Sequence, residues 1–401
     1  MNWEIKKLGD VCEFYNGKAH EKSIDENGKY KVVNSKFVSS NGTKAKRTQT
    51  AQFPLFKDDI VMVMSDVPNG KTLAKCFLID KDNTYSLNQR VCAFRTTNFD
   101  KRFLFYQLNR NQYFLNYNNG ENQSNLRKGD ILDCPLFVPS IKEQQQIVAI
   151  LDKAFTVIDK AKTNAQQNLL NAKELFESYL QNVFENKGDD WVEKTLGEVV
   201  DFFNGFAFKS KDAIEYSNTQ VIRMGNLYKN RLNLDRKSVF YPEEFSRYFK
   251  KYLLKENDLI ISLTGTTGKE DYGYTVKIPK TERKLLLNQR IAKFIIKDES
   301  IILRDLLFRF LLSRTFLDEL YKTANGTRQA NLSTETMKGL SISFPKSIKE
   351  QQQIVKKLNS LSAETKKLEI IYQQKINDLE ELKKSVLQKA FYGELTQKEL
   401  V

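Results

Sequence analysis

The sequence predicts an α+β fold in which two strand-rich α/β domains, arranged as a tandem repeat, are separated by two long helices. The first observation is an internal repeat, because the nonapeptide SIKEQQQIV occurs at residues 140–148 and again at 347–355. The second is a heptad pattern of apolar residues that follows each copy. The third is a series of short apolar runs separated by Asn, Gly, Asp and Ser ahead of each copy, which is typical of strands and turns.

The repeat extends over nearly the whole chain of 401 residues. The motifs Trp…Leu-Gly, Leu-Asn-Gln-Arg and Gly…Gln…Asn-Leu each occur twice in the same order, starting at Trp3 and Trp191, Leu87 and Leu287, and Gly120 and Gly326. The offset between the copies grows from 188 to 207 residues and then stays constant, so the second globular part carries insertions. We therefore expect domains at 1–139 and 187–346, helices at 140–186 and 347–392, and a tail at 393–401 that packs near the N-terminus.

The two helical segments carry matching seams of apolar or small residues. From Ile147 to Val183 and from Ile354 to Ala390 the spacing alternates between four and three residues with one stutter, and Lys383 is a polar residue within the second seam. Each helix could pack only on its own domain, but two matched seams favour pairing with each other. A two-fold relation between the copies makes the pair antiparallel. We then expect a dumb-bell with a nearly circular course of the chain, and about 60 Å of helix between residues 143 and 184.

Composition points to a polyanionic partner. The formal net charge is +14 and the isoelectric point is about 9.3, and the default polyanionic partner in the cytosol is nucleic acid. The four cysteines form no CxxC pair, and the first residues lack the pattern of a signal peptide. We therefore expect a cytoplasmic protein with reduced thiols, and no run of the sequence is long enough to cross a membrane.

The residues needed for catalysis are missing from the sequence. The single histidine, His20, stands in a hydrophilic stretch, and we expect it in a surface loop with no metal or catalytic role. The segments 265–269 and 69–72 resemble phosphate loops but do not fit the GxxxxGK[ST] spacing. No two prolines are adjacent, which excludes the loop that captures a flipped adenine in an amino-methyltransferase. The chain is predicted to be a non-catalytic binder that has no cofactor and no metal of its own.

The repeated nonapeptide has two interpretations. Ser140 and Ser347, each followed three residues later by glutamate, have the spacing of a helix capping box. A capping box does not require three glutamines, so we interpret the segment as a docking surface for one partner that is bound twice. The predicted docking residues are Glu143, Gln144, Gln145, Gln146, Glu350, Gln351, Gln352 and Gln353.

Together these features resemble the specificity subunit (HsdS) of type I restriction–modification systems. The resemblance rests on the Trp…Leu-Gly openings, the segment ISLTGTTGK at 261–269, the Leu-Asn-Gln-Arg motifs and the Glu-Gln-Gln…Ile-Val sequence that heads each long helix. It implies that each globular domain is a target recognition domain for one half of a split site in double-stranded DNA, and that the helices set the spacer. It also implies two modification (methyltransferase) subunits as partners, joined by restriction (translocase/nuclease) subunits. S-adenosylmethionine, ATP and Mg would belong to those partners only, so that the complex would be both a site-specific deoxyribonuclease and an adenine-specific methyltransferase.

Basic and amide side chains in the loops are the candidates for DNA contacts, because Lys and Arg bind phosphates while Arg, Asn and Gln read base edges. In the first domain they are Asn34, Ser35, Lys44, Lys46, Arg47, Asn69, Lys71, Asn122, Arg127 and Lys128. In the second domain they are Arg223, Asn226, Lys229, Arg231, Arg236, Lys237, Thr266, Thr267, Lys269 and Arg328. The second copy has a Thr-Gly-Thr turn at residues 264–266, and the first copy has the different sequence MSDVPNGK at the corresponding residues 64–71. The family pattern therefore does not identify the DNA-contacting residues of this loop in the first domain. The shared Asn-Gln-Arg triplets are expected to brace the fold.

Two alternatives stay open at this point. The chain could be the recognition subunit of a related enzyme that cuts on both sides of its site. It could also be a scaffold in which a helical hairpin holds two protein-binding domains, and such a protein would show no salt-dependent affinity for DNA.

Overall fold

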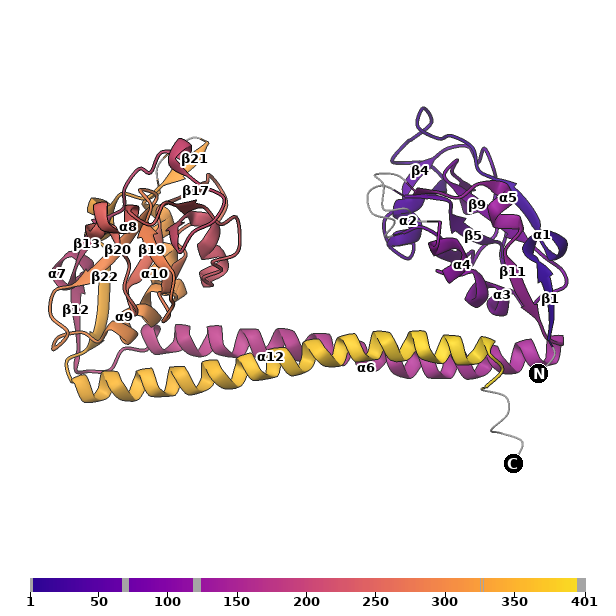
Figure 1. The fold of residues 1–401 in the computed structure, drawn as a ribbon. Helices are drawn as coiled ribbons and strands as arrows, with labels where there is room; N and C mark the ends of the chain where they lie inside the picture. The colour runs from indigo at the N-terminus through magenta and orange to yellow at the C-terminus, as the bar shows by residue number, and fades with distance from the viewer. Residues whose placement is uncertain (1–2, 67–71, 118–123, 325, 327, 395–401) are drawn as a thin grey trace. The chain divides into compact units, whose positions relative to one another are not determined.

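The computed structural model describes residues 3–66, 72–117, 124–324, 326 and 328–394. The chain forms two compact units, Met1–Ala165 with Lys375–Val401 and Gln166–Gln374. Each unit combines one globular domain with part of both long helices (Figure 1). The helices are therefore shared by the two units. The division into separate domains and helices at residues 139, 186, 346 and 392, which was expected from the sequence, remains a prediction. The tail from residue 395 onward lies outside the described residues.

The globular part of the first unit, domain 1, contains eleven strands and five short helices among its described residues. In chain order they are β1 (Glu4–Lys7), α1 (Leu8–Val11), β2 (Glu13–Asn16), β3 (Tyr30–Val33), α2 (Ser35–Ser39), β4 (Lys46–Thr48), β5 (Ile60–Val63), β6 (Ser65–Asp66), β7 (Cys76–Leu78), β8 (Tyr85–Leu87), β9 (Val91–Arg95), α3 (Lys101–Leu108), α4 (Gln112–Leu115), β10 (Ser124–Asn125), α5 (Lys128–Leu132) and β11 (Pro135–Val138).

The globular part of the second unit, domain 2, repeats this order of strands. Its elements are β12 (Trp191–Thr195), α7 (Leu196–Val199), β13 (Val200–Asn204), η1 (Ser210–Asp212), β14 (Thr219–Ile222), η2 (Met224–Asn230), β15 (Phe240–Tyr241), α8 (Phe245–Tyr248), η3 (Lys250–Tyr252), β16 (Leu259–Ser262), β17 (Thr264–Thr266), β18 (Thr275–Lys277), β19 (Lys284–Leu287), β20 (Ile291–Ile296), α9 (Arg304–Leu311), α10 (Arg314–Lys322), β21 (Gln329–Asn331), α11 (Thr334–Lys338) and β22 (Ser341–Pro345). Here η2 stands in the place of α2, and η1, α8 and η3 are added.

The two domains share one topology. Their sheets have the strand orders β2-β9-β5-β7, β4-β3-β8, β1-β11 and β10-β6 in domain 1, and β13-β20-β16-β18, β15-β14-β19, β12-β22 and β17-β21 in domain 2. The pairs β3–β8 and β14–β19 are parallel, and the other pairs are antiparallel. The sequence repeat therefore corresponds to a repeat of the fold, and the α+β prediction is confirmed.

The central strand of each four-stranded sheet explains the apolar runs of the sequence. All four residues of β5 are buried. Ile60 and Met62 belong to the core cluster that extends to the long helices, whereas Val61 and Val63 belong to a second cluster on the other face. A strand whose two faces are both covered must be apolar at every position, since side chains alternate between faces. The strand β16 of domain 2 has the same burial.

A close backbone approach explains the Asn-Gly and Leu-Asn-Gln-Arg motifs. The carbonyl oxygen of Asn88 lies 2.1 Å from where a Cβ atom of Gly17 would stand, and Asn288 and Gly205 repeat this relation at 2.1 Å. The amide of Gly17 donates to Val91 O, which holds the approach in place. Only glycine fits here, and this geometry agrees with a bracing role for the motif.

The long helices are α6 (Ile141–Glu185) and α12 (Ile348–Phe391). In the first unit, Lys162 pairs with Glu380 at 2.6 Å, and Lys383 pairs with Asp159 at 2.7 Å. The residue number falls on one helix while it rises on the other, so the helices pair antiparallel. In the second unit, the Nζ atom of Lys357 on α12 lies 5.1 Å from the ring centre of Tyr179 on α6. The predicted pairing is confirmed within each unit.

Each long helix packs on a globular domain as well as on the other helix, so the alternative in which each helix packs only on its own domain is wrong. In the second unit, Phe184 of α6 contacts Phe310 of α9 with ring centres 5.3 Å apart. In the first unit, Phe391 of α12 contacts Phe103 of α3 at 5.5 Å. Phe184 and Phe391 are 207 residues apart and occupy equivalent places in the repeat. The heptad seam did not include them, because they lie on the helix face turned to the domain. One seam residue, Leu368, is 37% exposed.

The expectation that His20 lies in a surface loop is wrong. Its side chain is fully buried, with Nδ1 2.7 Å from Lys18 O and Nε2 2.7 Å from the hydroxyl of Ser86. Since a carbonyl oxygen only accepts, Nδ1 donates to Lys18 O, while Nε2 and the hydroxyl of Ser86 bond to each other. Ser86 in turn accepts from the amide of Phe53 at 3.1 Å. The histidine is a satisfied core group that ties its loop to β8.

Candidate nucleic-acid interface and helix junctions

The loop that follows β14 in domain 2 contains five of the basic residues predicted to contact DNA, between residues 223 and 237. The side chains of Arg223, Lys229, Arg231 and Lys237 are exposed. The backbone of Lys229 and Lys237 has positive φ values of 54° and 51°, so the loop turns sharply at both positions. The guanidinium of Arg236 lies 4.2 Å from the ring centre of Tyr228, which holds the arginine against the loop.

The strand pair β17–β21 carries the other predicted residues of domain 2. Thr266 pairs with Gln329 in the register of the two strands. Thr267 donates from its hydroxyl to Gly326 O at 3.0 Å, and the exposed side chains of Lys269 and Arg328 stand on the two sides of this turn. Residues about 60 positions apart in the sequence therefore form one projecting structure.

These two groups of residues meet on one surface. The rings of Tyr228 and Tyr274 are in edge contact at 6.0 Å, and the amide of Thr275 donates to Asn230 Oδ1 at 2.8 Å. The hydroxyl of Thr264 at the start of β17 contacts the sulfur of Met224 at the start of η2. The loop therefore packs against β17 and the start of β18. We call the cations of the loop and of the strand pair the domain 2 basic surface; they are Arg223, Lys229, Arg231, Arg236, Lys237, Lys269 and Arg328.

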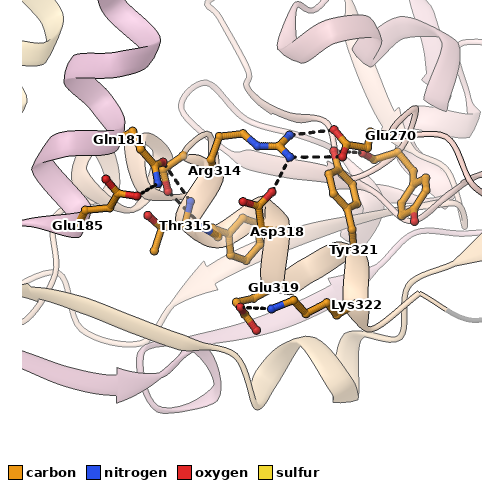
Figure 2. Close-up of polar contacts among 12 residues, drawn as sticks. Gln181, Glu185, Glu270, Arg314, Thr315, Asp318, Glu319, Tyr321 and Lys322 are labelled. Atoms are coloured by element: carbon orange, nitrogen blue, oxygen red, sulfur yellow. Dashed lines mark hydrogen bonds and ion pairs between the residues drawn. The ribbon is translucent and has the colours of Figure 1, made fainter.

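Two carboxylates beside this surface, Glu270 and Asp235, are paired with cations that do not belong to it. Figure 2 shows Arg314 of α10 between Glu270 and Asp318, with a closest contact of 2.8 Å to Glu270. The Arg314 guanidinium lowers the pKa of Glu270 below its ordinary value, so this carboxylate stays ionised and paired. Asp235 is likewise paired with Arg283 at 2.8 Å. The charge of Lys269 is therefore not cancelled by the adjacent Glu270.

One cation of the surface reaches the long helix of the same unit. A guanidinium nitrogen of Arg231 lies 3.6 Å from Glu369 Oε2 on α12, while the arginine side chain remains 76% exposed. An ion pair so open to water contributes little to stability. It does hold the basic loop beside α12 and leaves the arginine free to exchange its partner.

Asn226 must be corrected as a candidate for base contact. Its side chain is 1% exposed, its Oδ1 accepts from the amide of Arg223, and its Nδ2 donates to Asn233 O and Arg236 O. With every polar atom used inside the loop, it shapes the loop and does not face a ligand. The sequence analysis missed Tyr228, which is 46% exposed among these cations. The signal was present, since LYKNRLNLDRK interleaves an aromatic residue with basic ones.

In domain 1 the predicted residues separate into two places. Lys44 and Lys46 are exposed near β4, where the guanidinium of Arg47 donates to Gly28 O at 2.6 Å. Arg127 and Lys128 stand at the start of α5, and Figure 1 shows β4 and α5 well apart. The structure therefore does not bring these two groups of cations together.

The two amide and hydroxyl candidates of domain 1 have structural partners. Asn34 caps α2 by accepting from the amide of Phe37, and Ser35 donates to Ser65 O at 3.4 Å. Both side chains are half-buried and bond within the domain. Asn69, Lys71 and Asn122 lie outside the described residues.

The glutamines of the repeated nonapeptide divide into buried and exposed ones. Gln145 and Gln146 in the first copy, and Gln352 and Gln353 in the second, are exposed. The side chains of Gln144 and Gln351 are 1% and 0% exposed. Buried amides that bond within the chain are not available to a partner, so the docking prediction is wrong for these two residues.

Both buried glutamines bond to the same structural elements of their domains. Gln144 Oε1 accepts from the amide of Asp100, the residue that caps α3, at 2.9 Å. Gln351 Oε1 accepts from the amide of Leu303, the residue that precedes α9, at 2.8 Å. Their Nε2 atoms donate to the carbonyl oxygens of Pro139 and Pro345 at 2.9 and 2.8 Å. This arrangement occurs at both junctions and accounts for one of the three repeated glutamines.

The glutamates of the two copies differ in their contacts. Glu143 accepts from the amide and the hydroxyl of Ser140 at 2.9 and 2.8 Å, which is a complete capping box. These two donors lower the pKa of Glu143 below its ordinary value of 4.5. Glu350 accepts from the indole of Trp191 at 3.4 Å. Identical sequence therefore does not give identical bonding at this position.

The described residues provide neither a metal site nor a membrane span. Within them, no three His, Cys, Asp or Glu side chains are grouped so that they could hold a metal ion. None of the helices there combines the length and the apolar character that a membrane span needs.

Comparison with known proteins gives consistent matches. The family model for the type I restriction modification DNA specificity domain matches residues 1–171 and again residues 188–381. The specificity subunit of the type I restriction enzyme MjaVIII from Methanocaldococcus jannaschii is 25% identical over 417 residues, covering 100% of this chain and 94% of that protein. A solved chain from a study of complex assembly and conformational transition of the type I R-M system aligns with a TM-score of 0.75 and 17% identity over 98% of both chains. The HsdS subunit from Thermoanaerobacter tengcongensis aligns with a TM-score of 0.55 and 16% identity over 98% of this chain and 97% of that one.

Two copies of this domain and two long paired helices identify the chain as a DNA specificity protein. This chain belongs to the family of type I restriction–modification specificity subunits, since the family model covers both halves of it. The family resemblance stated from the sequence is confirmed, and so is the role in DNA specificity.

Proposed function

We propose that each globular domain reads one half of a split site in double-stranded DNA, and that the paired helices keep the two halves at one spacing. One observation carries this proposal: two domains of a DNA specificity family, with the same topology, are linked in one chain by helices of 45 and 44 residues. In domain 2 the basic surface supplies cations for phosphate contacts, with Lys269 and Arg328 on its projecting strand pair. Two domains that differ in loop sequence would read two different half-sites.

The proposal assigns the chemistry to partner subunits. Two modification subunits would dock at the two junctions, where Gln145, Gln146, Gln352 and Gln353 are exposed on the first turns of the long helices. Restriction subunits would join this core. The partners would supply the S-adenosylmethionine, ATP and Mg sites, so this chain would select DNA without reacting with it. A complex that acts on host DNA would lie in the cytoplasm.

Methylome sequencing tests the proposal. A host that expresses this chain with its modification partner should gain methylated adenines at one split motif, and a host with the partner alone should not. Exchanging residues 187–346 for the corresponding domain of another specificity subunit should change one half of the motif and keep the other. If the exchange changes both halves of the motif, or neither half, the proposal is contradicted. A partner that carries both methyltransferase and nuclease in one chain would instead favour the enzyme that cuts on both sides of its site.

A further inference from the structure

The two buried glutamines bond to their domains at the starts of α6 and α12. A small rotation of a long helix at its start displaces its far end by a large distance. Gln144 lies in the first turn of α6, and its amide joins the end of β11, through Pro139, to the cap of α3, through Asp100. Gln351 lies in the first turn of α12 and adds a third bond, from Nε2 to Ile301 O at 2.8 Å. At each junction, one glutamine side chain thus connects the start of the long helix with the end of the preceding strand and with the start of α3 or α9.

A second contact of the same kind lies two turns further along each helix. In domain 1, Arg102 and Tyr106 of α3 both donate to Asp152 of α6, the arginine at 2.7 Å. In domain 2, Arg309 of α9 donates to Asn359 of α12 at 2.6 Å. Asp152 and Asn359 are 207 residues apart, so they occupy equivalent positions of the repeat. Their chemistry differs between the copies, whereas the glutamine is the same in both.

We propose that Gln144 and Gln351 are positioning residues that fix the direction in which each long helix leaves its recognition domain, and thereby the spacing between the half-sites. The second clause rests on the proposed function. The part of α6 in the first unit, Ile141–Ala165, is about 37 Å long at 1.5 Å per residue. A rotation of about 5° at its start moves its far end by about 3 Å, close to the 3.4 Å rise of one base pair. Selecting one spacing from its neighbours therefore requires a stiff junction.

Glutamine suits this position because its amide both donates and accepts. Glutamate would keep the acceptor for Asp100 but place an oxygen against Pro139 O. Methionine has a similar length and volume but makes neither bond, which leaves buried backbone groups unpaired. The informative variants are Gln144→Met and Gln351→Met. Gln145→Met and Gln352→Met are exposed controls of identical chemistry for the isolated subunit, where no modification partner is bound. Leu55→Ala is a second control, since it creates a cavity in a core cluster of domain 1 that contains no residue of α6 or α12.

The first test needs no DNA. Spin labels at Lys280→Cys in domain 2 and Lys366→Cys on α12, in a Cys12→Ser background of the full chain, report the distance between domain and helix. Both lysines are exposed and belong to the second unit. Gln351→Met should at least double the width of the distance distribution, and Gln352→Met should leave it unchanged. A width unchanged by Gln351→Met overturns the inference, whatever the protein does with DNA.

The second test uses the complex with its modification partner and DNA sites whose spacers differ by single base pairs. The wild type should methylate one spacing preferentially, and the pair Gln144→Met with Gln351→Met should reduce this preference at least fivefold with both half-sites unchanged. Leu55→Ala should lower the amount of active complex and keep the preference. If the double variant keeps the wild-type preference, the glutamines only stabilise the fold and the inference fails. If the wild type methylates no split site, the proposed function fails, and the spin-label result alone judges the junction.

Discussion

Lys383 Nζ lies 2.7 and 2.8 Å from the two carboxylate oxygens of Asp159, and 4.8 Å from the ring centre of Phe155. The lysine occupies an apolar position of the α12 seam, and its partner is on α6. A polar residue at such a position fixes the register of a helix pair, because any shift leaves the charge unpaired beside apolar neighbours.

Reversal of this ion pair tests the antiparallel register. Lys383→Glu brings two carboxylates together and should lower the thermal unfolding midpoint of the subunit, with a cost of about 1 kcal/mol because both side chains remain partly exposed. Adding Asp159→Lys should restore most of the loss. If the double variant is no more stable than Lys383→Glu alone, the two residues do not pair in solution. Glu381→Lys, which disturbs an exposed pair within α12, is the matched control.

Gly17 tests the brace between β2 and the turn after β8. A Cβ atom at this position would stand 2.1 Å from Asn88 O, so Gly17→Ala should destabilise domain 1 by about 2–4 kcal/mol, measured by urea unfolding. Gly129→Ala is the control, since nothing lies within 4 Å of a Cβ atom at that helical position. It should be neutral or stabilise by about 0.5–1 kcal/mol. Equal effects of both substitutions would contradict the close approach.

The fold was more predictable than the contacts of individual polar residues. The seams from Ile147 and Ile354 predicted that the helices pair, because a heptad pattern depends on helix geometry alone. The two-fold relation between the copies predicted that the pair is antiparallel. The burial of Gln144 could not be predicted, because the pattern of the first turn is the same whether its amide meets water or the domain. His20 was misplaced for a similar reason. Its hydroxyl partner, Ser86, is 66 residues away and brought near by the fold.

The candidate DNA surface also depends on contacts between residues distant in sequence, which could not be predicted. Composition identified the basic loop near Lys229 and the turn near Lys269 separately. Their convergence depends on the contact between Tyr228 and Tyr274, which no local pattern predicts. Asn226 illustrates the opposite error, since an amide in a basic loop has the same sequence signature whether it reads a base or bonds to its own backbone.

The capping box at the start of α6 predicts a pH-dependent stability. The pKa of Glu143 is lowered in the folded state, so its interaction with Ser140 stabilises the fold above pH 4.5 and is lost as the pH falls through the lowered value. Glu143→Gln should lower the unfolding midpoint at pH 7, at a cost of about 0.5–1 kcal/mol. At pH 3 the wild type and the variant should have nearly the same midpoint. An equal gap at both pH values would show that the carboxylate charge is not involved.

Glu369 predicts an effect on DNA affinity. Glu369→Gln removes the charge that holds Arg231, so the arginine becomes free to bind phosphate. Affinity for non-specific duplex DNA at low salt should rise about two- to threefold, and its salt dependence should become steeper by up to about one phosphate contact. The control is Glu364→Gln on the same helix, which removes the same charge from a carboxylate bonded to Ser360. An equal rise in both variants would attribute the effect to net charge, and Arg231 would then have no special role.

The length of the paired helices predicts the spacing between the half-sites. Repeating residues 159–165 in α6 and the equivalent residues 366–372 in α12 adds one heptad to each helix and keeps both seams. The addition is about 10 Å at 1.5 Å per residue, or about three base pairs, and turns one half-site by about a third of a turn relative to the other. Methylome sequencing of an active double-insertion variant should show both half-sites unchanged and a spacer longer by about three base pairs. Insertion into one helix only should break the register and destabilise the subunit, which serves as the control. Because the added rotation can also reduce activity, the informative result is the motif of a variant that still methylates DNA: the original spacing would show that the helices do not set the gap.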